Sequence, residues 1–483
     1  MLRSTLTCRN KAAHDVIVSG GGLVGAATMA SLQQLRERTT SSAASGAASS
    51  ALSRLMMVDV GKRPTYDPAN IFHQLRTVSI TPVSSKILDN LGGWDKLTTK
   101  HSYYRIAVRH EQANSPLLPE PEHTSSVFLR KLLGSKTSTE PLLEFTDLRK
   151  PVGFMCYNAE LNAAMVSVVE EHAANATHDV LRFGSKLESI VLPPKDDVDG
   201  PWGTATLKTG DTAEEETFGL LLGCEGRGSP LRDVLHTASV QHDYAQTAFV
   251  CDVRLDKPAD GNVCCFQNFF RDGMIIALLP MSEDTANIVF STTPQHAKKL
   301  MGATQEELVK ELNQRLHDFA PSDIPKVLEV PEGPVNGVAK RKQGSFPLRL
   351  NVATSPYAPR AILLGDAAHG IHPFAGQGLN LGIYDVCALT DVLERAIRSG
   401  HDIGNTVTVG QVFAGEMLAH TTPMIVGMET IKQMLYGMPS LACVGMKAIN
   451  QLPLLSTLGK DAIYQVSSGA AFAARHPNCF LLD

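Results

Sequence analysis

The chain has 483 residues, more than a single hydrophobic core usually supports, so we expect two domains or one domain with a large insertion. Apolar residues make up 43% and charged residues 19%, which excludes a globally disordered protein. The formal net charge of −5 argues against a broad nucleic-acid surface, so we expect no nucleic-acid partner. No apolar run approaches the roughly 20 residues that a membrane-spanning helix needs.

Two features bear on the cellular compartment. The nine cysteines show no metal-binding or redox spacing, so we expect reduced thiols in an intracellular compartment and no metal site. Residues 1–13 carry basic residues and no acid, a pattern typical of a short mitochondrial presequence. An ordinary basic N-terminus would give the same pattern.

The first chemical motif follows at once. An apolar strand at residues 16–19 leads into a G-x-G-x-x-G motif and then a helix expected over residues 26–38. In such a motif Gly20 makes the tight turn, Gly22 lets the backbone approach a pyrophosphate, and Gly25 lets the helix pack on the strand. The pyrophosphate would lie at the N-terminus of that helix.

Two polar residues downstream extend this motif. The next apolar strand, residues 55–58, ends in Asp59, which would hold ribose hydroxyls. The spacing to Asp59 is longer than usual because residues 39–51 form a Ser- and Ala-rich insertion, expected as an exposed loop. Arg76 could bridge the phosphate and the ring of a bound cofactor, or could simply be an exposed arginine.

A second strand-to-glycine turn lies mid-chain. The apolar residues 219–222 run into G-C-E-G-R-G, in which Glu225 supplies an acid. We interpret this turn as a loop over the pyrophosphate of a cofactor. One more ordinary strand-to-helix turn would look alike.

The third turn, in the C-terminal third, organises the chain. The apolar strand at residues 361–364 ends in Gly365 and Asp366, where a ligand would meet the carboxyl end of a parallel sheet. Asp366 offers a carboxylate to sugar-like hydroxyls. A buried strand, a turn and a structural aspartate would also fit.

Beyond that strand, glycines open a helix. Pro373 stops regular structure, and Gly376, Gln377 and Gly378 let bare backbone approach a flat ligand. From Leu379 the pattern predicts an amphipathic helix, whose free N–H groups and positive dipole end suit the negative charge of a reduced flavin. Together the three turns imply one extended cofactor, FAD.

The rest of the chain predicts a second sheet and a helical tail. Residues 246–346 alternate as strands, with a helix expected over residues 297–319. The Met-rich residues 407–468 are expected to be helical. Their methionines could fill core gaps or form a soft surface for a greasy ligand or a membrane.

These motifs resemble a known family over about residues 15–468. The chain looks like the class A flavin monooxygenases, and within them the ubiquinone-biosynthesis hydroxylases, most of all the mitochondrial members that hydroxylate ring carbon 5. The motifs that carry the resemblance are V-I-V-S-G-G-G-L-V-G, Q-L-R-T-V-S-I-T-P, L-G-G-W-D-K-L, L-L-G-C-E-G-R-G-S-P-L-R, I-A-L-L-P-M-S and G-D-A-A-H-G-I-H-P-F-A-G-Q-G-L-N-L-G. The family's middle motif usually reads G-A-D-G, whereas Cys224 and Glu225 stand here.

The resemblance implies a function and residue roles. A flavin hydroperoxide would transfer one oxygen from dioxygen to the ring of a polyprenylated phenol. Gly378, Leu379 and Asn380 would offer backbone N–H groups to the flavin pyrimidine edge, and Pro373 would lie beside the site of oxygen attack. Asp366 would bind ribitol. His369 and His372 could be metal ligands or bases, but shaping the loop is the favoured reading.

The implied architecture is an α/β, Rossmann-like FAD-binding domain with a β-sheet substrate domain, the hydroxybenzoate-hydroxylase-type fold. We expect a discontinuous FAD-binding domain, a substrate domain in two pieces and a C-terminal helical region. Their limits are 14–100, 151–235 and 350–406 for the first, 101–150 and 236–349 for the second, and 407–483 for the third.

The resemblance also implies partners and a location. Electrons would come from NAD(P)H or from ferredoxin and its reductase. We expect a peripheral protein on the matrix side of the mitochondrial inner membrane and a ubiquinone-biosynthesis complex as a partner. Two alternatives stay open: a soluble NAD(P)H-dependent phenol hydroxylase, and a non-catalytic flavin-binding scaffold.

Overall fold

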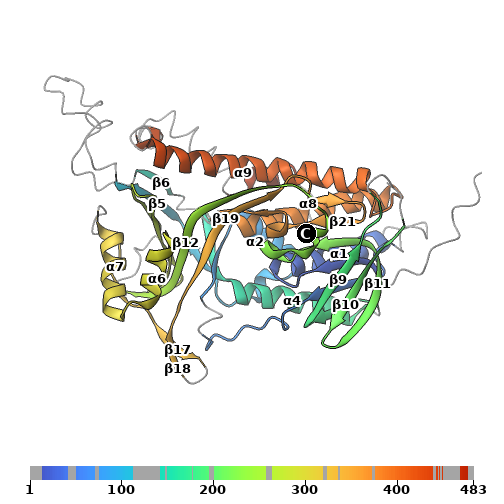
Figure 1. Cartoon of the computed structure of the whole chain (residues 1–483), viewed down its shortest axis with the longest axis horizontal. Helices are drawn as coiled ribbons and strands as arrows, with labels where there is room; N and C mark the ends of the chain where they lie inside the picture. The colour runs from blue at the N-terminus through green and yellow to red at the C-terminus, as the bar shows by residue number, and fades with distance from the viewer. Residues whose placement is uncertain are drawn as a thin grey trace, which may run out of the picture.

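The structure, a computed structural model, describes most of the chain (Figure 1). The described ranges are 14–41, 51–70, 75–111, 142–146, 150–176, 178–194, 201–256, 264–318, 324–335, 338–372, 376–438 and 468–476, with a few residues between 442 and 449. The Ser- and Ala-rich insertion falls mostly outside them, as do residues 1–13.

The first sheet has a parallel centre. Its order is β20-β21-β11-β1-β2-β8, and every neighbouring pair from β21 to β8 runs parallel. The central strands are buried on both faces, which explains their unbroken apolar sequences. The strands are β1 (His14–Ser19), β2 (Leu55–Asp59), β8 (Val180–Phe183), β11 (Thr212–Gly223), β20 (Tyr357–Ala358) and β21 (Ala361–Leu363); β10 (Gly203–Thr209) pairs with β11, and β9 (Ser185–Val191) pairs with β10.

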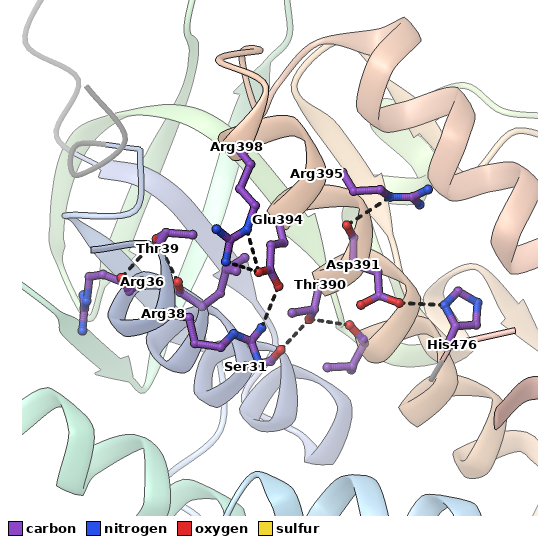
Figure 2. Close-up of polar contacts among 12 residues, drawn as sticks. Ser31, Arg36, Arg38, Thr39, Thr390, Asp391, Glu394, Arg395, Arg398 and His476 are labelled. Atoms are coloured by element: carbon purple, nitrogen blue, oxygen red, sulfur yellow. Dashed lines mark hydrogen bonds and ion pairs between the residues drawn. The ribbon is translucent and has the colours of Figure 1, made fainter. Parts of the chain in front are cut away.

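Helices α1 (Leu23–Ser41), α4 (Asn158–Ala174) and α8 (Gly378–Arg398) pack with this sheet into one large core. Polar contacts join α1 to α8 along their outer edge (Figure 2). The Ser31 hydroxyl hydrogen-bonds that of Thr390 at 2.5 Å, and Arg38 pairs with Glu394 at 3.3 Å. These contacts hold the helix after the first glycine motif against the helix after the last.

The second sheet is mainly antiparallel, as the alternating sequence predicts. Its order is β22-β19-β12-β15-β14-β13-β5-β6, and only β13 and β5 pair in parallel. The strands are β5 (Arg105–His110), β6 (Leu143–Thr146), β12 (Ser239–Leu255), β13 (Cys264–Phe269), β14 (Ile275–Pro280), β15 (Thr285–Thr292), β19 (Gln343–Ala353) and β22 (His369–Gly370); short β16 (Val327–Glu329) pairs β12.

One face of the second sheet is covered by α6 (Pro294–Gly302) and α7 (Gln305–His317). The single helix expected over residues 297–319 is therefore wrong. The chain breaks at Thr304, whose side chain and backbone form a capping box with Glu307 and start a new helix. Sequence periodicity alone misses this break because both helices keep the same apolar spacing.

The other main elements are a two-stranded sheet of β17 (Glu332–Val335) and β18 (Val338–Arg341), a small three-stranded sheet and a long helix. The small sheet orders as β3 (Thr77–Ile80), β7 (Gly153–Tyr157) and β4 (His101–Tyr103), and α2 (Pro82–Asn90) follows β3. In the tail, a short π-helix (Thr406–Gln411) leads into α9 (Val412–Gly437), which Figure 1 shows running across the molecule from α8 toward β5 and β6. The short α12 (Ala470–Ala473) returns to α8.

The structure bears on the expectations for the methionines, for membrane-spanning helices and for the cysteines. Met424 and Met428 of α9 are buried in the main core, whereas Met438 is exposed. No helix within the described ranges is long and apolar enough to cross a bilayer. Cys387 is disulfide-bonded, so the expectation of reduced thiols fails at this position.

Candidate functional site

The three glycine turns lie side by side at one edge of the first sheet. Parallel register sets Ser19 beside Val58 and Gly223, and Gly223 beside Leu363, so the carboxyl ends of four strands meet. Backbone hydrogen bonds continue past the strands: the Cys224 N–H donates to Ser19 O at 2.7 Å. Strand ends of this kind are where open α/β sheets bind ligands.

The first and last turns also touch directly. A Cβ added to Gly365, which has a φ of +57°, would lie 3.2 Å from Val24 at the start of α1. The Leu364 N–H donates to Gly223 O at 2.9 Å, so the middle strand links the other two turns. The convergence on which a single extended cofactor depends is therefore present.

The glycines of the first turn differ in their surroundings. Gly20 has a φ of +105°, and a Cβ there would lie 2.5 Å from Cys224 O. A Cβ on Gly25 would lie 1.8 Å from Gly20 O, so α1 can approach the turn only without a side chain. Gly22 is exposed, and a Cβ there would meet nothing within 4 Å. Backbone at Gly22 is thus open to an incoming ligand.

Asp59 ends β2 with its carboxylate held by the same turn. Its Oδ2 accepts the Gly21 N–H at 2.5 Å and its Oδ1 accepts the Gly61 N–H at 2.6 Å. The side chain is half-buried. Each carboxylate oxygen keeps acceptor capacity beyond these bonds, so a diol could donate to it.

Glu225 braces the middle turn from within. The Ser229 hydroxyl donates to Glu225 Oε2 at 2.7 Å, and Ser229 also caps α5 (Pro230–Val234). Burial raises the pKa of Glu225, which hydrogen bonds from Ser19 and Ser229 partly offset. The carboxylate therefore connects the first strand to the middle turn.

Asp366 faces the middle turn across the edge of the sheet. Arg227 Nε pairs with Asp366 Oδ2 at 3.2 Å, and Arg227 Nη2 donates to Ile371 O at 3.2 Å. Both side chains of the pair are half-exposed. Sequence reasoning did not single out Arg227 as a site residue, although a basic residue inside a glycine turn is a usable signal for an anionic ligand.

The N-terminus of α8 lies beside Asp366. A Cβ on Gly378 would lie 3.7 Å from Asp366 Oδ1, and Gly376 has a φ of +64°. Gln377 precedes the helix and makes no side-chain cap hydrogen bond, and Leu379 is only partly buried. The first-turn N–H groups and the positive dipole end of α8 therefore suit a negatively charged group.

Asn380 joins this helix start to the small sheet. Its Oδ1 accepts the Thr81 N–H at 3.0 Å, and its Nδ2 donates to Ser79 O at 2.8 Å. The side chain is fully buried. The Ser79 hydroxyl hydrogen-bonds Tyr103 Oη at 2.8 Å, so β3 and β4 are fixed against the last turn.

Two of the residues predicted for the site, Arg76 and Pro373, are not among the contacts described above. Arg76 is exposed just before β3, and its backbone carbonyl accepts the Asn158 N–H at 2.9 Å. Pro373 lies outside the described residues.

The two histidines of the last turn point inward. His369 Nε2 contacts Asp385 Oδ2 at 2.6 Å, and the His372 ring meets the Tyr244 ring edge-on at 4.7 Å between centroids. Within the described ranges no group of three or more His, Cys, Asp and Glu side chains is arranged to hold a metal.

The site fits FAD on its own geometry. Bare backbone lies open at Gly22, carboxylates stand at Asp59 and Asp366, and a helix start without a side-chain cap follows at Gly378. These are the donors and acceptors that a pyrophosphate, two polyols and a reduced ring require.

Comparison with known proteins agrees with this fit. The FAD binding domain family matches residues 14–403. The ubiquinone biosynthesis monooxygenase COQ6 of Danio rerio is 28% identical over 466 residues, covering 91% of this chain and 87% of the relative. Human COQ6 is 26% identical and covers 94% and 90%. Both relatives are named as mitochondrial.

A solved structure shares the fold. The p-nitrophenol 4-monooxygenase PnpA of Pseudomonas putida superposes with a TM-score of 0.62 over 94% of this chain and 98% of its own, at 15% identity. The parallel sheet for the cofactor and the antiparallel sheet beside it are those of the hydroxybenzoate-hydroxylase type. Chemistry of this kind uses dioxygen and a reductant. The chain therefore belongs to the FAD binding domain family and is an FAD-dependent monooxygenase similar to COQ6.

Proposed function

We propose that this monooxygenase hydroxylates the aromatic ring of a polyprenylated phenol in ubiquinone biosynthesis. The observation that carries the proposal is the likeness to COQ6 proteins over 91% and 94% of the chain, more than the matched FAD binding domain spans. The convergence of the three glycine turns supports it, because it provides for one extended FAD.

We assign the cofactor to the turns as follows. The ADP part takes the first turn, Glu225 braces the middle turn, Arg76 approaches from the small sheet, and ribitol and flavin take the last turn. The residues are Gly20, Gly22, Gly25, Asp59, Arg76, Glu225, Gly365, Asp366, Gly376, Gln377, Gly378, Leu379 and Asn380.

Bound FAD supplies the reduction of dioxygen and the delivery of one oxygen atom to the ring. The protein binds and orients both partners and excludes water. Gly378 and Leu379, with Pro373, form the catalytic group: N–H groups of the first α8 turn stabilise negative charge on the flavin edge. Asp366 holds the ribitol in register with them.

The proposed substrate domain has the limits 101–150 and 236–349, which take in most of the second sheet. The FAD-binding domain takes 14–100, 151–235 and 350–406, and residues 407–483 form the C-terminal region. We further propose peripheral attachment to the matrix side of the mitochondrial inner membrane and membership of a biosynthetic complex, in keeping with the mitochondrial relatives.

The test supplies each electron donor separately. Purified FAD-loaded protein receives a prenylated phenol under ¹⁸O₂, with either reduced ferredoxin and its reductase or NADPH. We expect a product carrying one ¹⁸O atom, with turnover driven by ferredoxin. A matched phenol without the prenyl tail should react at least ten-fold more slowly.

Other outcomes identify the alternatives. Faster turnover of the tail-free phenol with NADPH would indicate a soluble phenol hydroxylase. Absence of product with either donor, while FAD stays bound, would contradict the proposal and favour a flavin-binding scaffold.

A further inference from the structure

Both histidines of the last turn are connected to the same distant helix. We define the Gly365 loop as residues 365–372, which follow β21 of the first sheet and include β22 of the second. His369 and His372 of this loop are buried. The side chains that hold them lead to α9, which begins at Val412, beyond the matched family region that ends at residue 403.

The first connection passes through Asp385 of α8, a fully buried carboxylate. Its Oδ2 accepts His369 Nε2 at 2.6 Å and the Gly365 N–H at 2.8 Å, and its Oδ1 accepts His420 Nε2 of α9 at 2.8 Å. One carboxylate thus ties α9 to the start and the middle of the Gly365 loop.

Asp385, His369 and His420 shift one another's pKa values. Burial opposes ionisation of Asp385, but the charge and hydrogen bonds of His369 and His420 lower its pKa to about 2. Asp385 raises the pKa of His369 against its burial, whereas burial lowers the pKa of His420. These directions favour a charged His369 beside the Asp385 carboxylate and a neutral His420, and the contacts keep the buried carboxylate from being left without a partner.

The His420 ring is surrounded by contacts from the C-terminal segment and α8. The ring meets Phe472 edge-on at 5.2 Å between centroids, and Phe472 stacks on Tyr384 at 4.6 Å. His476 contacts Asp391 of α8 at 2.9 Å, as drawn in Figure 2, and Glu416 of α9 at 3.5 Å. The C-terminal segment therefore fixes α9 to α8 around His420.

The second connection lies about 18 Å further along α9, the rise of the twelve residues that follow His420. Lys432 Nζ lies 3.4 Å from the centroid of the Tyr244 ring, and the Tyr244 hydroxyl donates to Glu429. Tyr244, on β12, meets the His372 ring edge-on at 4.7 Å. Helix α9 thus contacts Tyr244, which in turn packs against His372 at the far end of the Gly365 loop.

We propose that α9 is a positioning strut for the flavin, holding the Gly365 loop through His420 at one end and through Lys432 and Tyr244 at the other. This loop carries Asp366, which lies beside the N-terminus of α8. A shift of the loop moves Asp366 relative to that helix end, and so alters both the affinity for FAD and the electrostatic setting of its ring. His420 and Lys432 are positioning residues, since neither belongs to the glycine turns.

The test compares His420→Leu, which removes the donor to Asp385, with His420→Gln, which keeps an N–H near the Nε2 position. Thr422→Ala, on the exposed side of the same helix, is the control. FAD dissociation constants, the visible flavin spectrum and the flavin midpoint potential are measured on purified protein. We expect at least ten-fold weaker FAD binding and a shifted spectrum for His420→Leu, near-complete rescue in His420→Gln, and no change in Thr422→Ala.

The second anchor keeps the proposal falsifiable if His420→Leu does not fold. Lys432→Met retains the length of the side chain and removes its charge from the Tyr244 ring, whereas Lys432→Arg restores a cation. We expect several-fold weaker FAD binding in Lys432→Met and recovery in Lys432→Arg. The proposal is overturned if Lys432→Met and every His420 variant that folds keep the wild-type FAD affinity, flavin spectrum and midpoint potential.

Discussion

The glycines of this protein have different roles, and the atoms that an added Cβ would meet distinguish these roles. Gly25 is buried in the first turn, where a Cβ would collide with Gly20 O, whereas Gly22 faces open space. Glycine at 25 is therefore a packing requirement and glycine at 22 an opening for ligand. Identical letters in one motif serve the fold in one place and the cofactor in another.

The packing requirement gives a direct prediction at Gly25. In Gly25→Ala the new Cβ would lie 1.8 Å from Gly20 O, so the turn must deform, and we expect loss of bound FAD and a lower thermal midpoint. Gly415→Ala, in a helix position where a Cβ meets nothing within 4 Å, is the matched control and should gain up to about 1 kcal/mol from helix propensity. Equal midpoints and flavin content for the two variants would contradict the packing role.

Asp366 carries the proposed ribitol contact. We expect Asp366→Ala to weaken FAD binding about ten-fold, which corresponds to roughly 1.4 kcal/mol, and therefore to lose FAD during purification. Asp243→Ala removes another aspartate from an exposed pair with arginine, here with Arg349 at 3.1 Å, and should stay yellow. The measurement is the absorbance ratio of flavin to protein. A fully yellow Asp366→Ala would refute the assignment of Asp366 to the ribitol.

At the scale of elements, the site depends on how the start of α8 is fixed. The helix begins with two partly buried residues and then buries Asn380, whose amide satisfies backbone groups of β3 and Thr81. The small sheet thus holds the helix end that we assign to the flavin edge. The helix gains a defined position without a capping side chain that would occupy its N–H groups.

Removing that amide should loosen the helix start. Asn380→Ala leaves the Thr81 N–H and the Ser79 carbonyl buried without their partner, which costs about 1–3 kcal/mol. We expect a lower midpoint in urea unfolding and weaker FAD binding, whereas the exposed Asn175→Ala should match the wild type within about 0.5 kcal/mol. A wild-type unfolding curve for Asn380→Ala would disprove the link.

At the scale of the whole molecule, the two sheets meet where the Gly365 loop crosses between them, and α9 spans both (Figure 1). The junction contains His372, whose pKa is lowered to about 3 by burial and by the nearby charges of Lys432 and Arg227. Stability of the whole chain should therefore depend on keeping this ring neutral.

Proton binding by His372 sets whether stability rises or falls with pH. Between pH 6.5 and 3 the unfolded chain protonates His372 and the native protein does not, so this group lowers stability as pH falls. Relative to pH 7, the loss at pH 5 should be about 2 kcal/mol. His372→Phe should flatten the decline of the thermal midpoint between pH 7 and 5, while the exposed His401→Phe keeps the wild-type slope. Parallel curves for all three proteins would exclude this origin.

The sequence by itself determined the parts of this protein that depend on short-range patterns. Apolar runs ending in glycine predicted β1, β11 and β21, and the G-x-G-x-x-G spacing predicted the turn into α1, because each is set by neighbouring residues. The family, the cofactor and the class of reaction followed from those motifs, and the comparisons confirm them.

Only the tertiary structure decided which side chains meet across the chain. Asn380 bonds to Ser79 across 301 positions, Arg227 to Asp366 across 139, and the Gly365 loop reaches α9 through Asp385. Such pairs leave no local period or spacing, since a buried hydrogen bond depends on packing that brings distant segments together. The turns could be predicted one by one, but the network that holds them in place could not.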